Sequence, residues 1–264
     1  MADLLMNYIG LSLDDFEDFE EKNVSTITKK DAIKNDNTIL IKKLSKYVVD
    51  MGLPSGTLWG RYNVGVDIYQ PLEIASQLYG HYYAWAEVNT KDSYTWDTYK
   101  TDTHYKIKLS DKPKIDTSEH KILCLEEDAA YNEMRICGAK IPTIEQFEEL
   151  LKYCNFLPVE KMYGIGPEHR WDKNIESLDG IVLISKINGN QIFFPVNGYY
   201  NGSQQITGTE CGLYWTANQS DRFQQCAIAL TIKFSKSAIE PPIIKFTTQE
   251  KRMGLSIRPV INIM

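Results

Sequence analysis

The side chains that could carry chemistry are few and lie far apart in this chain. The five cysteines include no CxxC pair, and the four histidines include no pair at positions i and i+4. This spacing supports neither a zinc site nor a disulfide framework. Histidines with no nucleophile or base nearby in the sequence indicate surface or structural roles. We therefore expect no catalytic residues and no resident metal site.

The run from Tyr199 to Phe223 has the strongest binding character in the sequence. Aromatic rings offer contact area and amides offer hydrogen bonds, a mixture that suits sugar stacking or protein recognition. The alternative is an ordinary connecting loop in which Trp215 and Tyr199 are buried. The ligand-binding residues that we predict are Tyr200, Asn201, Ser203, Gln204, Gln205, Asn218, Gln219, Asp221, Arg222 and Phe223.

The clearest element that could position such a site is a helix over residues 143–154. Thr143 and Gln146 have the spacing of a capping box at its start. Apolar residues then recur on one face. The acids Glu145, Glu148 and Glu149 point away from that face, so we interpret them as a solvated surface rather than as an acid–base pair.

Most of the remaining pattern predicts strands, turns and long loops. Residues 53–56 read as a turn between two short strands, and Asn188-Gly189 is a strong hairpin signal. Residues 89–120 read as long surface loops, where binding sites are common. The predicted strands are 48–49, 57–59, 79–87, 180–185, 191–196, 212–217, 227–234 and 254–260, with a further turn at 198–202.

Residues 1–45 differ from the rest of the chain, which gives a predicted boundary with a single domain at 46–264. Acidic side chains cluster at 14–21 and are interrupted only by two phenylalanines. Such segments fold onto a partner or stay disordered. We expect a docking or oligomerisation arm, the alternative being a solvated leader. The predicted docking residues are Leu4, Leu5, Tyr8, Ile9, Phe16 and Phe19.

The length and net charge of the chain limit the kinds of partner that it could bind. The chain has 264 residues and a formal net charge of -6, which does not favour nucleic acid. No apolar stretch reaches the length of a membrane span. The N-terminus has an acid where a signal peptide needs a basic region. These features predict a protein made in a cytoplasm, without an export signal of its own.

Several motifs occur in an order that resembles the Fibrobacter succinogenes major paralogous domain family. The resemblance covers about residues 46–261 and implies an α+β, C-type-lectin-like fold. In that fold the first and last strands pair, and long loops carry function. The family is found in gut Bacteroidetes and their phages. The motifs are Val49–Trp59, Asn63-Val64-Gly65, Tyr79–Trp85, Ile141-Pro142-Thr143, Gly198–Gly202, Gly212–Thr216 and Ser256–Val260.

The resemblance also raises two cofactor hypotheses. Formylglycine-generating relatives hold copper with a cysteine pair, which here would be Cys211 and Cys226, although no family motif surrounds them. C-type lectins bind Ca²⁺ with clustered oxygens. Asn218, Glu210 and Asp221 resemble such a site faintly, and a polar loop is the better interpretation. We expect no cofactor, with Ca²⁺ left open.

These observations predict a non-enzymatic binding or structural module. We expect a phage virion protein (a fibre, tail or capsid decoration) that recognises a bacterial surface glycan or protein. Residues 1–45 would dock it to other virion or envelope proteins, and an oligomer is expected. The alternatives are an envelope or cytoplasmic interaction protein of Bacteroidetes and a metal-dependent oxidase of the formylglycine-generating type.

Overall fold

The computed structural model of the chain is mostly β-strand with few helices in its described part. The predicted arm, apart from Ser45, lies outside that part, and so do all six predicted docking residues. No described helix has the length and apolar character needed to cross a membrane. The structure describes residues 45–69, 75–99, 122–160, 178–207, 211–234 and 242–262.

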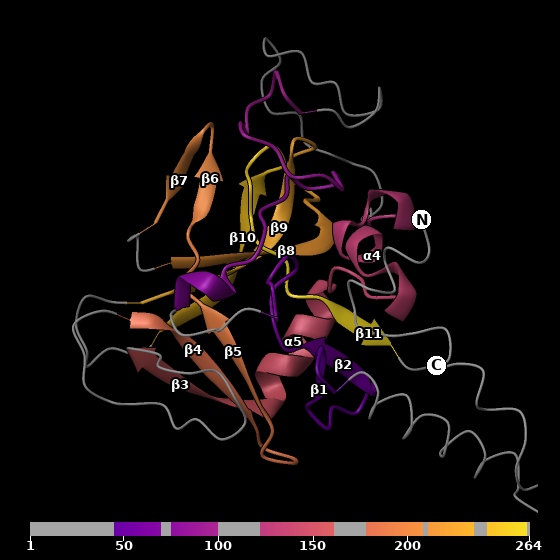
Figure 1. Cartoon of the computed structure of the whole chain (residues 1–264), viewed down its shortest axis with the longest axis vertical. Helices are drawn as coiled ribbons and strands as arrows, with labels where there is room; N and C mark the ends of the chain where they lie inside the picture. The colour runs from indigo at the N-terminus through magenta and orange to yellow at the C-terminus, as the bar shows by residue number, and fades with distance from the viewer. Residues whose placement is uncertain are drawn as a thin grey trace, which may run out of the picture. The chain divides into compact units, whose positions relative to one another are not determined.

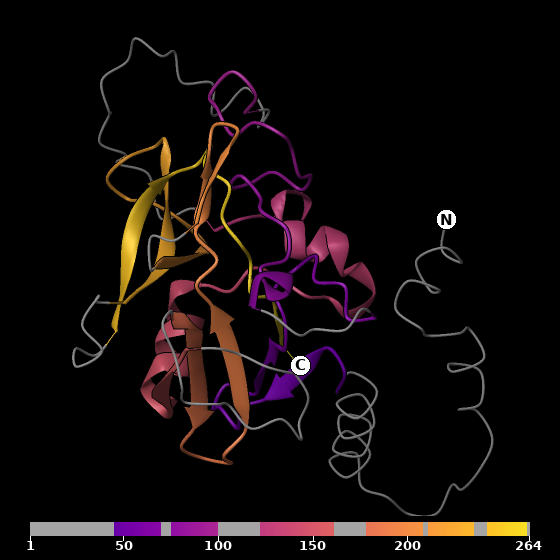
Figure 2. The ribbon, with the colours of Figure 1, turned by 60° about the vertical axis from the view of Figure 1, so that its left-hand side comes forward.

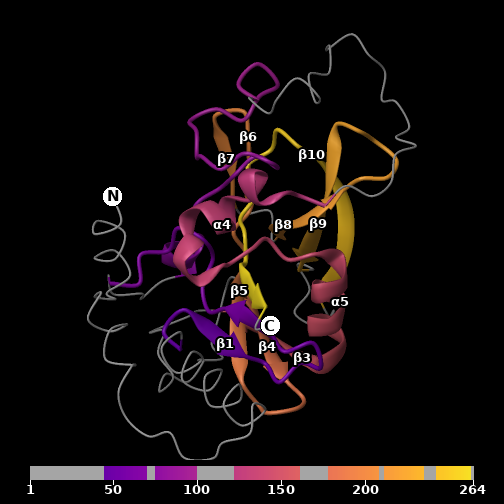
Figure 3. The same cartoon turned by 90° about the vertical axis from the view of Figure 1, so that its right-hand side faces the viewer.

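The two ends of the described domain share one sheet. Strands β1 (Val48–Asp50) and β2 (Thr57–Gly60) form a hairpin, as predicted, and Gly56 adopts a φ of 72° in its turn. The last strand, β11 (Val260–Asn262), pairs with the other edge of β2 (Figure 3). The first and last strands therefore do not pair directly, because β2 lies between them in the order β1-β2-β11.

Two further three-stranded sheets and one separate hairpin make up the other described strands (Figure 1). Every pairing within them is antiparallel. The sheets have the orders β3-β4-β5 and β10-β9-β8, and β6 and β7 form a two-stranded sheet. Their strands are β3 (Cys154–Glu160), β4 (Leu178–Ser185), β5 (Gln191–Pro195), β6 (Tyr199–Asn201), β7 (Gln204–Ile206), β8 (Cys211–Gln219), β9 (Cys226–Lys233) and β10 (Ile243–Glu250).

The predicted helix is confirmed as α5 (Ile144–Tyr153). Thr143 is its N-cap, and Thr143 and Gln146 form the reciprocal bonds of a capping box. Phe147 and Leu150 are buried on the apolar face, while Glu145 and Glu148 are exposed. The other described helices are short: η1 (Ala75–Leu78), η3 (Leu125–Glu127), α4 (Ala129–Glu133) and η4 (Arg135–Cys137).

The main core joins α5 to all three sheets. Phe147 of the helix lies 5.0 Å from Trp59 of β2, measured between ring centroids. The same cluster includes Phe194 of β5 and Tyr214 of β8. Burying each such ring contributes roughly 1.5–3 kcal/mol. This core therefore fixes the sheets around one helix.

Arg258 is a buried link between the two ends of the described domain and β5. Its guanidinium donates to the carbonyl of Arg61 at 2.5 Å and to that of Phe193 at 2.6 Å. It also lies over the Phe194 ring, 4.5 Å from the centroid. Burial lowers the pKa of Arg258 to about 10. A cation held by carbonyls and a ring indicates a structural role.

The predicted strand at 79–87 is wrong. Only Tyr83 makes a ladder contact, an isolated bridge with Leu255. Side chains also bond to backbone carbonyls of the segment: the Tyr94 hydroxyl donates to Tyr82 O, and the Trp215 indole donates to Tyr83 O. The alternation of large residues therefore reflects burial between distant segments rather than pairing in a sheet.

Two other predictions also need correction, and some strands were not predicted. Residues 198–202 were expected to be a turn, but Tyr199–Asn201 form β6. Residues 254–260 form isolated bridges before β11 begins at Val260, so the final strand is shorter than expected. Strands β3, β7 and β10 have no counterpart among the predicted elements. β3 and β10 lie at sheet edges, as do β5 and β8, which were predicted.

Candidate functional site

An open hollow of about 730 Å³ lies beside the β6–β7 hairpin. Its size is typical of ligand sites, which run from roughly 300 to 1,000 Å³. Three segments form its walls: residues 76–82, residues 90–94 and the hairpin with Thr207. We call it the tyrosine hollow, and its lining residues are Ser76, Tyr79, Gly80, His81, Tyr82, Thr90, Lys91, Asp92, Tyr94, Tyr200, Ser203, Gln205 and Thr207.

Packed tyrosine rings hold these walls together. Tyr200 of β6 lies 5.0 Å from the ring of Tyr82 and 5.4 Å from that of Tyr94. Tyr82 and Tyr94 are buried, whereas Tyr200 is half-buried. Burial raises the pKa of Tyr94 to about 12 and also raises the pKa of Tyr82. Both buried hydroxyls therefore stay protonated near neutral pH, and each donates to a backbone carbonyl.

The hairpin divides its side chains between two faces. Tyr200 pairs across the strands with Gln205, and Asn201 pairs with Gln204. Because adjacent residues of a strand point to opposite faces, only the first pair lines the hollow. The Gln205 amide donates to the Tyr82 hydroxyl at 3.0 Å and accepts from the Tyr200 hydroxyl at 3.4 Å. Gln205 therefore sets the position of both rings.

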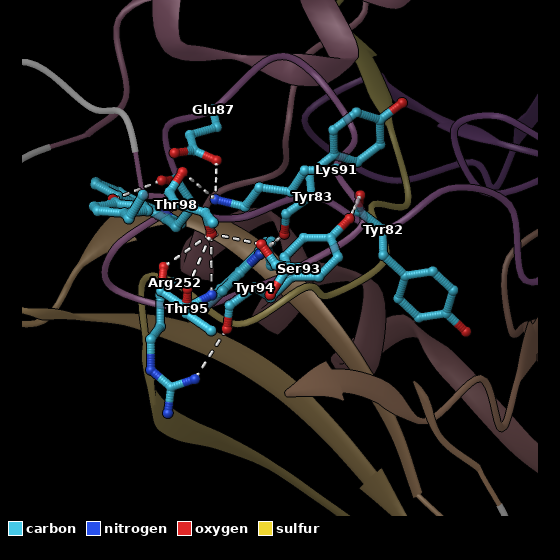
Figure 4. A network of polar contacts seen from close by, with 12 residues as sticks. Tyr82, Tyr83, Glu87, Lys91, Ser93, Tyr94, Thr95, Thr98 and Arg252 are labelled. Atoms are coloured by element: carbon cyan, nitrogen blue, oxygen red, sulfur yellow. Dashed lines mark hydrogen bonds and ion pairs between the residues drawn. The ribbon is translucent and has the colours of Figure 1, made fainter. Parts of the chain in front are cut away.

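The loop opposite the hairpin is held by its own polar network (Figure 4). The Thr98 hydroxyl donates to the carbonyls of Ser93 and Thr95. The Lys91 ammonium bonds to the Glu87 carboxylate at 2.5 Å and donates to the carbonyl of Thr98 at 3.2 Å. These contacts fix the backbone on both sides of Tyr94.

Backbone and side-chain bonds join this loop to the hairpin, and the two lie next to each other in Figure 2. Tyr94 and Gly202 exchange two backbone hydrogen bonds of 2.9 and 3.1 Å. Arg252 donates to the carbonyl of Tyr94 at 3.0 Å and to the side-chain oxygen of Asn201 at 2.7 Å. Arg252 therefore connects two walls of the hollow from outside its lining.

The structure separates the predicted ligand-binding residues. Tyr200, Ser203 and Gln205 line the tyrosine hollow, as one site. Asn201 and Gln204 belong to the other face of the hairpin. The remaining five lie at or beyond the end of β8: Asn218, Gln219, Asp221, Arg222 and Phe223.

Asn218 and Gln219 are each 5% exposed and bond to other residues of the protein. The Asn218 side-chain oxygen accepts from the backbone N–H of Ile144 at 2.9 Å, at the start of α5. The Gln219 oxygen accepts from the Lys251 ammonium at 2.9 Å. Both side-chain oxygens therefore hold other parts of the domain in place.

Asp221, Arg222 and Phe223 form the turn between β8 and β9. The Ser220 hydroxyl oxygen accepts from the backbone N–H groups of Arg222 and Phe223, each at 3.2 Å. Asp221 and Arg222 are exposed, and none of the three lines the hollow. They therefore form a separate surface.

Sequence reasoning missed the lining contributed by residues 76–94. Tyr82 lies in the segment that was predicted to be a strand, and His81 was interpreted as a scattered histidine. The available signal was the expectation that the loop starting at residue 89 carries binding residues. Lys91 and Asp92 lie in that loop and line the hollow.

The cofactor hypotheses can be tested against the positions of their donors. Cys211 lies opposite Lys233, at one end of the β8–β9 ladder, and Cys226 begins β9 at the other end. Seven residues of strand separate these ends, roughly 20 Å at about 3.3 Å per residue. Burial raises the pKa of each thiol to about 11. The pair therefore cannot share one copper ion.

The residues that resemble a calcium site also do not form a cluster in the described part of the chain. Asn218 uses its oxygen on α5, while Asp221 is exposed in the following turn. Glu210 lies outside the described residues. Within that described part, no three His, Cys, Asp or Glu side chains are grouped so that they could hold a metal ion.

Comparison of the chain with models of protein families, with curated proteins and with solved structures finds no match. The family resemblance therefore rests on the sequence motifs alone.

Proposed function

We propose that this chain is a non-enzymatic binding module whose tyrosine hollow recognises a bacterial surface glycan. The observation that supports the proposal most is the composition of the hollow: tyrosine rings lie beside an amide and several hydroxyl groups. A sugar has apolar ring faces and a rim of hydroxyls, and both can be matched there.

The rigidity of the walls supports binding. Two of the rings are buried, and Gln205, the Tyr94–Gly202 bonds and Arg252 hold the hairpin in place. A preformed site loses little conformational entropy when a ligand binds, because its side chains are already ordered. The hollow therefore has the construction expected of a recognition site.

The C-type-lectin-like fold and the virion setting belong to the same proposal. The opening hairpin and the last strand share a sheet, which agrees with a lectin-like domain whose ends meet. The virion role is supported by the sequence alone, through the family resemblance and the acidic segment before residue 46. We infer that this segment docks the domain and that the hollow faces the bacterium.

The enzymatic alternative receives less support from the geometry. The two cysteines of the oxidase hypothesis lie at opposite ends of a ladder, and burial raises the pKa of both thiols. A reactive thiol needs a lowered pKa so that the thiolate forms. Binding is therefore the function that we propose.

A glycan array with three variants tests the proposal. Gln205→Ala removes the amide that positions two rings, and Tyr200→Ala removes the half-buried ring. We expect each to lower the signal of the best glycans by about tenfold, equivalent to about 1.4 kcal/mol. Gln204→Ala is the matched control, because it removes the same amide from the other face of β7.

Thermal unfolding of each variant shows whether the domain remains folded. Equal array signals for wild type, Gln205→Ala and Tyr200→Ala would remove the hollow as the site. A loss with Gln204→Ala alone would place the site on the opposite face of the hairpin. An array without any bound glycan would refute glycan recognition itself.

A further inference from the structure

Lys91 and Asp92 both line the tyrosine hollow, and of these two only Lys91 has an ion-pair partner among the described residues. Lys91 lines it, but its ammonium is 2.5 Å from the Glu87 carboxylate. It also lies 5.5 Å from the centroid of the Tyr94 ring. The next residue, Asp92, is exposed and also lines the hollow. Its carboxylate makes no hydrogen bond or ion pair with any residue in the described ranges.

The other polar groups of the lining do not offset Asp92. The His81 ring nitrogen lies 3.4 Å from the Tyr83 hydroxyl, and Gln205 is bonded to two tyrosines. The rest of the lining that can hydrogen-bond is mainly hydroxyl groups of serine and threonine. Among the described residues of the lining, a ligand therefore meets one exposed carboxylate without an ion-pair partner, beside the paired Lys91 and several hydroxyl groups.

Aromatic rings add to the effect of this carboxylate. The face of a tyrosine ring carries negative potential and attracts ammonium groups. Lys91 demonstrates the preference within this loop, since its ammonium lies near the rings of Tyr94 and Tyr99. The whole chain is also negative, at -6, which attracts cations and repels anions.

We propose that the hollow selects a sugar with a free amino group, which places its ammonium against Asp92 and its ring against Tyr200. This inference rests on the proposed function, because it names the class of glycan that is bound. An acetylated amino sugar has the same ring but no charge. An acidic sugar places a second negative charge beside Asp92.

Isothermal titration with three oligosaccharides of matched length tests the inference. The probes are a fully deacetylated chito-oligosaccharide, its N-acetylated form and an oligogalacturonate. We expect the deacetylated form to bind about two- to fivefold more tightly than the acetylated form, the range that an exposed ion pair gives. The acidic probe should bind most weakly. The preference should shrink at high salt, because salt screens exposed charges.

Two charge-matched variants locate the effect. Asp92→Asn should bring the affinities of the deacetylated and acetylated probes together. Asp97→Asn removes an exposed carboxylate from the same loop, outside the lining, and should leave the preference unchanged. Both variants alter the net charge equally, so a long-range effect of charge would change the preference between the probes by the same amount in each variant. Thermal unfolding should show the stability of wild type in each.

The outcomes separate this inference from the proposed function. Equal affinities for the two chito-oligosaccharides, or a preference that persists in Asp92→Asn, would overturn the inference while leaving glycan binding in place. Tightest binding of the acidic probe would also overturn it. If none of the three probes binds, the amino-sugar inference falls, and the glycan array decides whether glycan recognition falls with it.

Discussion

Replacing Asn218 by alanine should lower stability and leave glycan binding intact. The substitution removes the 2.9 Å hydrogen bond to the Ile144 N–H at the first turn of α5. Water cannot easily replace it, because Asn218 is 5% exposed. Losing such a bond costs about 1–2 kcal/mol. For a domain of this size, each 1 kcal/mol lowers the midpoint of thermal unfolding by about 2–4 °C.

The assay compares Asn218→Ala with Gln205→Ala in thermal unfolding and in glycan titration. Asn218→Ala should lower the unfolding midpoint by about 2–8 °C with unchanged affinity. Gln205→Ala should show the reverse, a smaller thermal shift and weaker binding. The exposed Gln204→Ala should change neither quantity measurably. If Asn218→Ala weakens glycan binding while its midpoint stays at the wild-type value, the assignment of Asn218 to the fold is refuted.

Three further predictions concern the frame of the hollow and the thiols. Arg252→Ala should weaken glycan binding by about three- to tenfold in titration, because it releases the hairpin; wild-type affinity would contradict the connecting role. Gly65→Ala should lower the free energy of unfolding by about 1–3 kcal/mol, since φ is 84° and a Cβ would lie 2.2 Å from the His81 ring; an unchanged urea midpoint would argue against it. Burial raises the pKa of Cys211 and of Cys226 to about 11, so both thiols should react slowly with iodoacetamide in the native protein. Rapid alkylation of either thiol at neutral pH would contradict this prediction.

Features encoded within a few residues could be predicted from the sequence. The capping box of Thr143 and Gln146, three residues apart, and the apolar period after it were enough to place α5. Asn188-Gly189 likewise marked the β4–β5 hairpin. In both cases the residues that determine the structure are neighbours in the chain, so their physical chemistry can be read locally.

Features that depend on distant contacts could not be predicted in this way. Asn218 resembles any surface amide in the sequence, and only its contact with Ile144, 74 residues away, gives it a structural role. The segment at 79–87 has the alternation of a strand, but its carbonyls meet side chains such as that of Trp215. An alternating pattern of large residues shows that the segment is buried. It does not show which groups form hydrogen bonds with the backbone of the segment.

The candidate site shows the same division. The hairpin residues Tyr200 and Gln205 could be selected by type from their own run of sequence. Asp92 and His81 could not be joined to them, because the hollow forms only when three separated segments meet. Two of these segments are joined by the backbone bonds between Tyr94 and Gly202, which are more than a hundred residues apart in the sequence. Arg252 adds a further bond, to the carbonyl of Tyr94.

A crystal structure of the protein with its best-binding array glycan is the most direct test of the central claim. Glycan recognition in the tyrosine hollow predicts that the sugar lies against the Tyr200 ring, between the hairpin and residues 79–82. A sugar bound instead at the Asp221–Phe223 turn, with the hollow empty, would contradict the claim.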